Sequence, residues 1–544
     1  MADGTIQPGP GFSLAEVPTS IAATPEGAGT SPKQREPAQR DQVIEAVLAA
    51  GVTFWRDRDG AAYATMPADT GRGPQRYRVR APAFALVVRG TYGRANRRTV
   101  GKSARVIPGS ISEAALAETL PTLEAMACEG VEREPDVRVC RFDGAVWLDL
   151  GCPAWRLVRV DAGRWEVLDG ADVPLIRPDA MRPLPEPARA DRGATLDTLR
   201  GLLNVAPDRP HDFMLLLAWL VAALHPAGPY PVLALDGEQG SGKSTTCRML
   251  RKLVDPNKAD LRAPPRDEES LVIAATSARV IALDNVSAIS PGDADALCRM
   301  ATGGGFSKRK NYTDCDEYLA AVCRPVLLNG IPSLLARGDL ADRALAVTLP
   351  AIPDAKRRPE AEVWRDFEAA APAVLGLLLE ALARALADMP TLHLPRLPRM
   401  ADFARLACAA APAFGWTAGD MLDAIEGNRA DAVEAVIEAD PVATAVRGFM
   451  EGHHGAWAGT ASDLLAIVND GTPDELRRDR AFPKNAGRLS AHLRRIAPGL
   501  RRAGWDIALP TTGGRRGRTI RITPSSATGQ QRPATPDPEP GGYL

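Results

Sequence analysis

A glycine-rich loop that directly follows an apolar run constrains this chain more than any other feature. The run Val232–Asp236 predicts a buried strand, residues 237–244 follow the pattern Gly-x-x-x-x-Gly-Lys-Ser, and residues 245–254 predict a helix. In this pattern backbone N–H groups surround phosphates, the lysine reaches the β- and γ-phosphates, and the hydroxyl binds Mg²⁺. The sequence therefore predicts a site for ATP and Mg²⁺, and the alternative is a chance glycine-rich turn. The predicted nucleotide contacts are Gly237, Glu238, Gln239, Gly240, Ser241, Gly242, Lys243, Ser244 and Thr245.

Composition narrows the class of protein. The 544 residues suffice for several domains, and the net charge of −1 requires any nucleic-acid surface to be local. Eight cysteines without a Cys-x-x-Cys pair argue against a zinc ribbon and favour buried thiols of a reducing cytosol. The N-terminus lacks a secretory signal, and the longest apolar run, Phe213–Leu224, is too short to span a bilayer. The sequence predicts a soluble, cytoplasmic protein with no membrane partner.

Strand and helix patterns alternate around the loop. The candidate strands are Val232–Asp236, Arg279–Asp284, Pro325–Asn329 and Ala344–Leu349, which predicts a parallel α/β sheet. Further segments favour helices at 112–129, 371–389 and 401–411, and hairpins at 142–150 and 505–522. Helices followed by a hairpin at the C-terminal end are in the order of a winged helix.

Two polar residues at strand ends complete the predicted ATP site. Asp284 ends an apolar run about forty residues after the loop and is the candidate second Mg²⁺ ligand beside Ser244. Its neighbour Asn285 can position water but cannot take a proton, so hydrolysis is expected to be slow or to use another carboxylate. The candidates for that carboxylate are Glu268, Glu269, Asp316 and Glu317. Asn329 is suited to sensing the γ-phosphate, and the alternative is an amide that ends a strand at a turn.

Two arginines precede the last predicted strand. An arginine at this place, Arg337 or Arg343, can reach across a subunit boundary to stabilise charge on a transferring phosphoryl group. The alternative for each is an ordinary surface arginine.

The order of these motifs resembles the superfamily 3 helicase module, most of all the version in phage and plasmid primase-helicase proteins. The similarity covers about residues 140–350 and rests on Gly237–Ser244, Asp284-Asn285, Thr302–Phe306, Arg324–Asn329 and Asp342–Leu345. The resemblance implies an AAA+ type core and a homo-oligomeric ring, commonly a hexamer, with one DNA strand in its pore. It implies Asn329 as the sensor and Arg343, ahead of Arg337, as the arginine finger. The chain departs from longer relatives in lacking a recognisable primase domain and in carrying Asn285 where Glu is more frequent.

Two basic segments are candidate DNA contacts. The resemblance places Gly303–Tyr312 at the pore, and its flexible glycines, three cations and an aromatic suit a single strand, unless it is a solvated turn. Between residues 477 and 521 thirteen Lys and Arg face two acids, which indicates phosphate binding or else a solubilising surface. The candidate DNA-binding residues are Lys308, Arg309, Lys310, Arg488, Arg494, Arg495, Arg515, Arg516 and Arg518.

The predicted fold class is α/β, with a P-loop AAA+ type parallel sheet core. The expected parts are a disordered tail (1–40), an N-terminal α+β accessory domain (41–190), the ATPase core (191–358), a helical domain (359–440), a basic winged-helix-like DNA-binding domain (441–524) and a second disordered tail (525–544). The leading functional hypothesis is an ATP-dependent DNA helicase or translocase of mobile-element or phage replication. The alternatives are a DNA-tethered, ATP-binding switch or scaffold with little hydrolysis and, more distantly, a small-molecule kinase.

Overall fold

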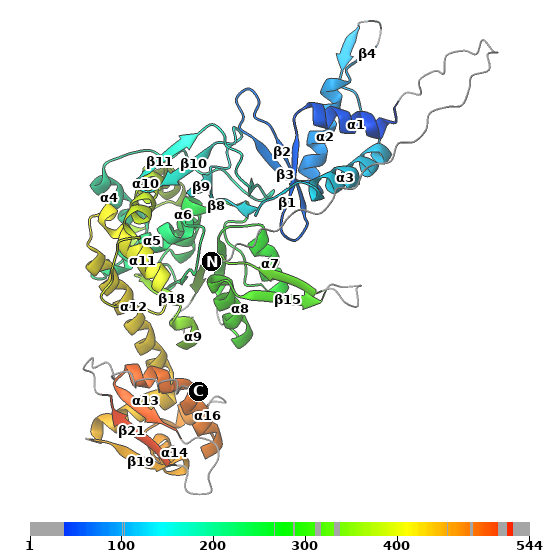
Figure 1. Cartoon of the computed structure of the whole chain (residues 1–544). Coiled ribbons are helices and arrows are strands. Elements are labelled where there is room, and N and C mark those ends of the chain that lie inside the picture. Colours follow the sequence, from blue (N-terminus) through cyan, green and yellow to red (C-terminus); the bar gives the residue numbers. More distant parts are fainter. Residues whose placement is uncertain are drawn as a thin grey trace, which may run out of the picture.

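The computed structural model describes residues 37–100, 102, 104–265, 267–286, 289–309, 317–330, 338–453, 455–478, 482–509 and 519–525. The predicted terminal tails lie outside these ranges except for residues 37–40 and Ser525. The described chain is a mixed α/β protein with parallel and antiparallel sheets. A central body lies between an N-terminal unit and a C-terminal unit (Figure 1).

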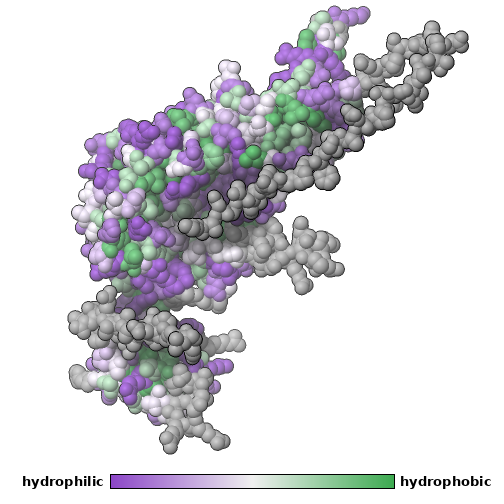
Figure 2. Space-filling model, viewed as in Figure 1, coloured by the Kyte–Doolittle hydropathy of each residue, from purple (hydrophilic) through white to green (hydrophobic). Residues whose placement is uncertain are grey.

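The N-terminal unit packs three helices against a small sheet of order β3-β2-β1-β6. The predicted helix 112–129 is confirmed as α3, whose cap Ser112 accepts a hydrogen bond from the backbone N–H of Ala115. Its elements are α1 (Gln39–Ala49), β1 (Thr53–Arg56), β2 (Ala62–Met66), β3 (Gln75–Arg78), α2 (Pro82–Ala95), β4 (Arg98–Val100), β5 (Arg105–Ile107), α3 (Glu113–Cys128) and β6 (Val131–Glu132). On the face shown in Figure 2 a hydrophobic area lies over this unit. The exposed apolar residues of the unit include Leu48 and Leu86.

A four-stranded antiparallel sheet, β11-β10-β9-β8, follows and packs on the central body. The predicted Asp-Gly hairpin joins its first two strands at Asp143 and Gly144, both with positive φ. The strands are β7 (Asp136–Val137), β8 (Val139–Phe142), β9 (Ala145–Asp149), β10 (Leu157–Asp161), β11 (Arg164–Leu168) and β12 (Leu175–Ile176). Val146, Leu148, Val158 and Val160 of this sheet share one hydrophobic core with the central helices.

The central body is built on a parallel sheet of order β14-β17-β13-β18. All four predicted strands are present, and the sheet's largest departure from the prediction is that β14 begins at Ile281 rather than Arg279. Arg279 is instead fully buried, where its guanidinium donates to the backbone carbonyls of Ala223 and His225. The elements are α4 (Arg192–Leu202), α5 (Pro210–Leu224), β13 (Val232–Gly237), α6 (Lys243–Val254), α7 (Glu268–Thr276), β14 (Ile281–Val286), α8 (Pro291–Thr302), β15 (Gly305–Arg309), β16 (Glu317–Ala321), β17 (Val326–Gly330), α9 (Gly338–Ala341) and β18 (Ala344–Leu349).

Alternation along the strands divides the sheet into two buried faces. Leu235, Ala282 and Leu327 pack with α6 in the larger core. Leu283 and Leu328 pack with α7 and α8 in a second core. Because alternate residues share a face, Asp284 and Asn329 lie on the face of Ala282 and Leu327, toward α6.

Three long helices cover the larger core, after a short 3₁₀ turn at Asp354–Lys356. They are α10 (Glu360–Asp388), α11 (Ala401–Phe414) and α12 (Ala418–Ala439). The sequence predicted that α10 starts at Ala371. The helix starts eleven residues earlier, at Glu360, and Pro372 lies within it. By length and hydropathy α10 could cross a bilayer, although 61% of its most apolar window is buried inside the protein.

The C-terminal unit (residues 441–525) has a three-stranded sheet of order β19-β21-β20 packed with helices. Its predicted order of helices followed by a hairpin is observed, with β19 as an additional strand that the sequence analysis missed. The elements are α13 (Pro441–Gly452), β19 (Trp457–Thr460), α14 (Ala461–Asp470), α15 (Asp474–Arg477), α16 (Ala486–Arg502), β20 (Trp505–Ala508) and β21 (Thr519–Pro524). Helix α12 joins this unit to the central body, because Val433 and Ile437 at its C-terminal end lie in the core of the unit (Figure 1).

Candidate functional site

The glycine-rich loop lies between the end of β13 and the start of α6. Gly237 has φ +142°, and a Cβ there would lie 2.4 Å from the carbonyl oxygen of Leu349 on β18. Gly242, the residue before the helix, is left-handed at φ +79°. Glycine is therefore required at both ends of the loop, and the free N–H groups of the first turn of α6 face the loop.

The side chain of Lys243 lies inside the loop and binds its backbone. Its Nζ donates to the backbone carbonyls of Gly237, at 2.7 Å, and Glu238, at 2.8 Å. The ammonium thus lies within the turn of chain whose N–H groups would receive phosphates. An anion in the loop would compete with these two carbonyls for the same ammonium.

The side chain of Asn204 stabilises the loop by hydrogen bonds. Its side-chain Nδ2 donates to the carbonyl of Ser241 at 3.0 Å and to the carbonyl of Pro350 at 2.8 Å, so it ties the loop to the chain that leaves β18. Asn204 has φ +48°, a conformation that asparagine tolerates better than most residues. No local sequence pattern indicates this role for Asn204, which follows shortly after the end of α4.

A hydrogen-bonded cluster of Ser244, Asp284 and Asn329 forms the second half of the site. The Ser244 hydroxyl donates to Asp284 Oδ1 at 2.9 Å, and Asn329 Nδ2 donates to the same oxygen at 2.7 Å. Strand order explains the meeting: β17 lies between β13 and β14, with Asn329 opposite Leu235 and Leu328 opposite Leu283. The carboxyl ends of three parallel strands thus bring the loop hydroxyl, the carboxylate and the amide together.

Asn285 occupies a bulge in β14. The register between β14 and β17 shifts after Leu283, Asn285 has φ +52°, and its backbone N–H donates to Asn329 Oδ1 at 2.7 Å. The acceptor role of Oδ1 fixes the orientation of the Asn329 amide, so that Nδ2 faces Asp284. The Asn285 side chain is exposed. The backbone conformation therefore explains why an asparagine occupies position 285, because few residues other than glycine, asparagine and aspartate adopt this conformation readily.

The alternative carboxylates for hydrolysis are placed only in part. Glu268 accepts a hydrogen bond from Arg299 at 2.7 Å, at the start of α7. Glu269 is exposed on the same helix. Asp316 lies outside the described residues, and Glu317 is described through the backbone of β16 alone.

Arg343 lies at the end of the sheet opposite the loop. Its carbonyl accepts from the backbone N–H of Val232, and β18 then runs in register with β13 from Ala344 to Leu349. Six strand residues separate the two ends by about 20 Å. Arg343 therefore cannot reach the loop of its own chain. Arg337, the second candidate, lies outside the described residues.

The predicted pore segment differs from a flexible loop. Gly303 ends α8 with φ +83°, and residues from Gly305 onward form β15, which pairs antiparallel with β16. Lys308 and Arg309 therefore lie on a strand, where they pair with Tyr318 and Glu317 of β16. Lys310 lies outside the described residues.

The basic face of α16 is exposed as the sequence predicted. Leu489, Leu493 and Ile496 are buried in the core of the C-terminal unit. Arg488, Arg494 and Arg495 lie on the exposed face of the helix. Arg515, Arg516 and Arg518, the predicted wing, lie outside the described residues.

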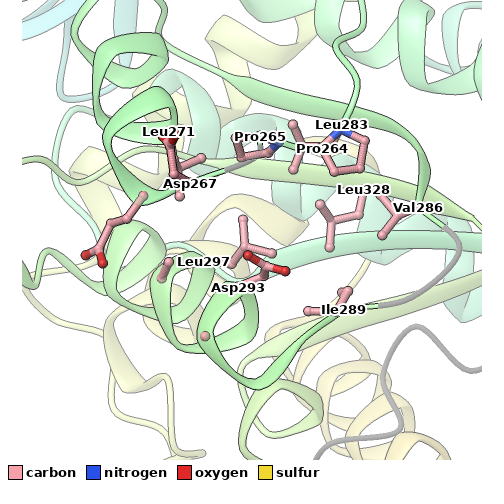
Figure 3. Close-up of a pocket in the computed structure, with 13 residues that line it drawn as sticks. Pro264, Pro265, Asp267, Leu271, Leu283, Val286, Ile289, Asp293, Leu297 and Leu328 are labelled. Carbon is pink, nitrogen blue, oxygen red and sulfur yellow. The ribbon is translucent and has the colours of Figure 1, made fainter.

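A pocket of about 210 Å³ lies on the other face of the parallel sheet (Figure 3). Leu283 and Leu328 contribute to its wall, with Pro264 and Pro265 beside Leu283, and Asp267 and Asp293 also line it. The strand residues that line this pocket alternate with Asp284 and Asn329. The pocket is therefore separated from the loop and its cluster by the sheet.

Two family models that match this chain describe a replication protein of mobile elements. Residues 196–433 match the family described as "Actinomycete integrative conjugative element replication protein", and residues 442–536 match the "AICE RepA C-terminal domain". No curated protein matches the sequence. Among solved structures, "The A form apo structure of NrS-1 C terminal region-CTR" covers 88% of this chain and 98% of its own at 11% identity, with a TM-score of 0.37. "The apo structure of NrS-1 C terminal region" covers 90% of this chain and 99% of its own at 12% identity, also with a TM-score of 0.37. These TM-scores are too low to bear on fold or function.

Proposed function

Because this chain is a replication-associated protein of the kind that mobile elements carry, we propose that it is an ATP-dependent DNA helicase or translocase. The observation that carries the proposal is the Ser244–Asp284–Asn329 cluster, hydrogen-bonded beside a glycine-rich loop at the carboxyl edge of a parallel sheet. The proposed core is of the P-loop AAA+ type, and the protein is proposed to act in the cytoplasm as a ring of identical subunits.

The donor atoms of the cluster fit Mg²⁺. A hydroxyl and a carboxylate oxygen lie 2.9 Å apart, and Mg²⁺ prefers such hard oxygens, usually one or two from protein with the rest from water and phosphate. Ser244 and Asp284 would hold the ion, which when bound would neutralise charge on the phosphates. Asn329 holds Asp284 in place through the 2.7 Å bond, so the carboxylate is oriented before any ligand arrives.

The loop residues supply the remaining parts of ATP binding. The N–H groups at the start of α6 and the Lys243 ammonium would bind the phosphates in place of the two loop carbonyls. Asn329, 2% exposed and in contact with both Ser244 and Asp284, would sense the γ-phosphate. Arg343 would complete the site of a neighbouring subunit, since it lies at the far end of the sheet in its own chain.

DNA would be bound at two places. Lys308 and Arg309 on β15, with Lys310 after them, would contact a single strand in the pore of the ring. The exposed Arg488, Arg494 and Arg495 of α16 would contact the backbone of duplex DNA. Both assignments follow from local positive charge in a chain of net charge −1.

ATP turnover with and without a single-stranded oligonucleotide tests the proposal. We expect Lys243→Ala to abolish turnover, because no other ammonium lies inside the described loop. Lys252→Ala is the matched control: this lysine is on the same helix, but its Nζ lies 4.5 Å from the centre of the Trp364 ring. Turnover that survives in Lys243→Ala would contradict the proposal.

Mixing two inactive variants tests the shared site. Lys243→Ala lacks the loop cation, and Arg343→Ala lacks the proposed finger, so each is expected to be inactive alone. In an equal mixture, roughly a quarter of subunit junctions join an intact loop to an intact Arg343, and turnover should return to that extent. A mixture as inactive as its components would refute the assignment of Arg343 to a neighbouring site.

A DNA-tethered ATP-binding switch remains the second candidate, and Asn285 is the observation that favours it. Its exposed side chain is an amide beside Asp284 and cannot take a proton from water. In this case ATP would bind to the wild type with Mg²⁺ and remain intact whether or not DNA is present. The turnover assay therefore separates the two functions.

A further inference from the structure

Three arginines converge on Asp342, the residue directly before the proposed finger. Asp342 follows α9, and its side chain is 9% exposed. Arg502 donates to both of its carboxylate oxygens, with Nη2 at 2.9 Å from Oδ2 and Nη1 on Oδ1. Arg399 reaches Oδ2 at 3.0 Å, and Arg429 reaches Oδ1 at 3.4 Å. One carboxylate therefore accepts from three guanidinium groups.

The three arginines come from different parts of the chain. Arg399 lies just before α11, and Arg429 lies on α12, so both belong to the central body. Arg502 is the last residue of α16, the helix with the basic face, and belongs to the C-terminal unit. The ion pair between Asp342 and Arg502 thus ties the candidate duplex-binding helix to the turn that carries Arg343.

The central body holds the strand after this turn by independent contacts. Asn428 of α12 accepts from the backbone N–H of Ala346 at 3.0 Å and donates to its carbonyl at 2.5 Å. Asp342 also keeps Arg399 and Arg429 when Arg502 leaves. Loss of Arg502 therefore does not leave the Asp342 carboxylate without a partner. Arg502 is the member of the cluster that can leave it for another anion.

Asp342 and a DNA phosphate are alternative partners for Arg502. Burial alone would raise the pKa of Asp342, but the hydrogen bond and charge of Arg502, with Arg429 and Arg399, lower it below its usual value. The carboxylate is thus ionised near neutral pH and competes for Arg502 as one anion. A DNA phosphate is a second anion of the same bidentate kind and can replace the carboxylate as the partner of Arg502.

We propose that Asp342 and Arg502 form a latch through which DNA bound on α16 changes the position of Arg343. Without DNA, Arg502 holds the turn of Asp342 and Arg343 against the C-terminal unit. Duplex DNA on the basic face draws Arg502 to a phosphate and frees the turn from the C-terminal unit, while Arg399 and Arg429 keep Asp342 on the central body. Asp342 is a positioning residue in this scheme, and the effect on ATP turnover rests on the proposed function of Arg343.

Hydrogen–deuterium exchange of the full chain tests the latch without nucleotide. The segment to follow is 338–346, which contains α9, the turn and the start of β18. Arg502→Gln removes the charge of the latch and keeps a long polar side chain. Arg501→Gln is the matched control, because Arg501 is the preceding residue of α16 and pairs with Asp506 inside the C-terminal unit at 2.6 Å. Each variant loses one positive charge from the same helix.

The latch predicts opposite behaviour for the two variants. Arg502→Gln should exchange roughly tenfold faster in 338–346 than the wild type, which corresponds to about 1.4 kcal/mol, with no further rise when duplex is added. The wild type and Arg501→Gln should exchange slowly alone and faster with a duplex oligonucleotide, whose binding is followed by fluorescence anisotropy in the same sample.

Two results would overturn the proposal, and they are distinguishable from each other. If duplex binds but Arg502→Gln exchanges like Arg501→Gln, the latch is wrong and DNA binding stands. If no duplex binds to the wild type, both the latch and the proposed duplex site on α16 fall. Absence of ATP hydrolysis affects neither reading, since the measurement contains no ATP.

Discussion

Replacing Asn329 by aspartate changes the charge of the cluster without changing its shape. The substitution exchanges the donating Nδ2, 2.7 Å from Asp284 Oδ1, for an oxygen. At neutral pH a charge-assisted hydrogen bond worth about 1.5–3 kcal/mol is lost. Two carboxylates would also repel by about 4 kcal/mol at 4 Å and an effective dielectric constant near 20. Uptake of a proton by the pair limits the damage, so we expect Asn329→Asp to lose about 3 kcal/mol of stability at pH 7.5.

The sign of the pH dependence follows from that proton. The pKa of the pair in the folded variant lies above that of aspartate in the unfolded chain, so the folded state binds more protons. Stability is therefore regained as pH falls, by up to about 1.4 kcal/mol for each pH unit. The deficit should shrink to about 1 kcal/mol at pH 5.5, where a shared proton restores the hydrogen bond.

Scanning calorimetry at pH 7.5 and pH 5.5 measures this difference. For a folding unit of 150–250 residues, a deficit of about 3 kcal/mol lowers Tm by roughly 6–12 °C. Asn329→Ala is the control: it also loses the Nδ2 donor, and in addition the acceptor of the Asn285 N–H, but it adds no charge, so its deficit should not shrink at low pH. An Asn329→Asp deficit that stays constant or grows on acidification would refute the close approach of the two side chains.

Three further substitutions test other parts of the site. Asn285→Glu should lower stability by about 1–2 kcal/mol in thermal unfolding, because glutamate is strained at φ +52°, whereas Asn285→Asp should not. Gly237→Ala should abolish soluble expression or ATP binding, because its Cβ would lie 2.4 Å from a backbone oxygen. Gly201→Ala on α4, where a Cβ would meet open space, should be tolerated. Equal behaviour of the two variants would contradict the geometry. Burial lowers the pKa of His225 to about 4. Below pH 6.5 the unfolded chain therefore binds a proton at this residue that the folded chain does not bind. Urea titrations should therefore show the wild type losing about 2–3 kcal/mol more than His225→Asn between pH 6.5 and 4.5.

The sequence allowed the sheet and most of the site to be predicted because the signals are local. An apolar run followed by Gly-x-x-x-x-Gly-Lys-Ser fixes a strand, a turn and a helix start, and the structure has them at Val232–Gly237 and Lys243–Val254. Asp284 and Asn329 could be nominated because each ends an apolar run. Their contact could not be predicted, because it depends on β17 lying between β13 and β14.

Other features depend on contacts between residues far apart in the chain. Asn204 and Ser241 are joined by the packing of α4 behind the loop, and no pattern in either segment indicates the other. Arg502 was counted among the cations of a basic region, yet its guanidinium is bound to Asp342, 160 residues away. Helix α10 was begun too late because Pro372 resembles a helix start, whereas tertiary packing keeps the helix continuous through it.

Strand separation on a forked DNA duplex tests the central claim most directly. The labelled duplex is mixed with the purified protein and Mg²⁺, with ATP or with a nonhydrolysable analogue, and with Lys243→Ala in parallel. The account predicts separation that requires ATP hydrolysis and Lys243. Binding of both ATP and the fork, with the nucleotide unhydrolysed and the strands still paired, would contradict a motor.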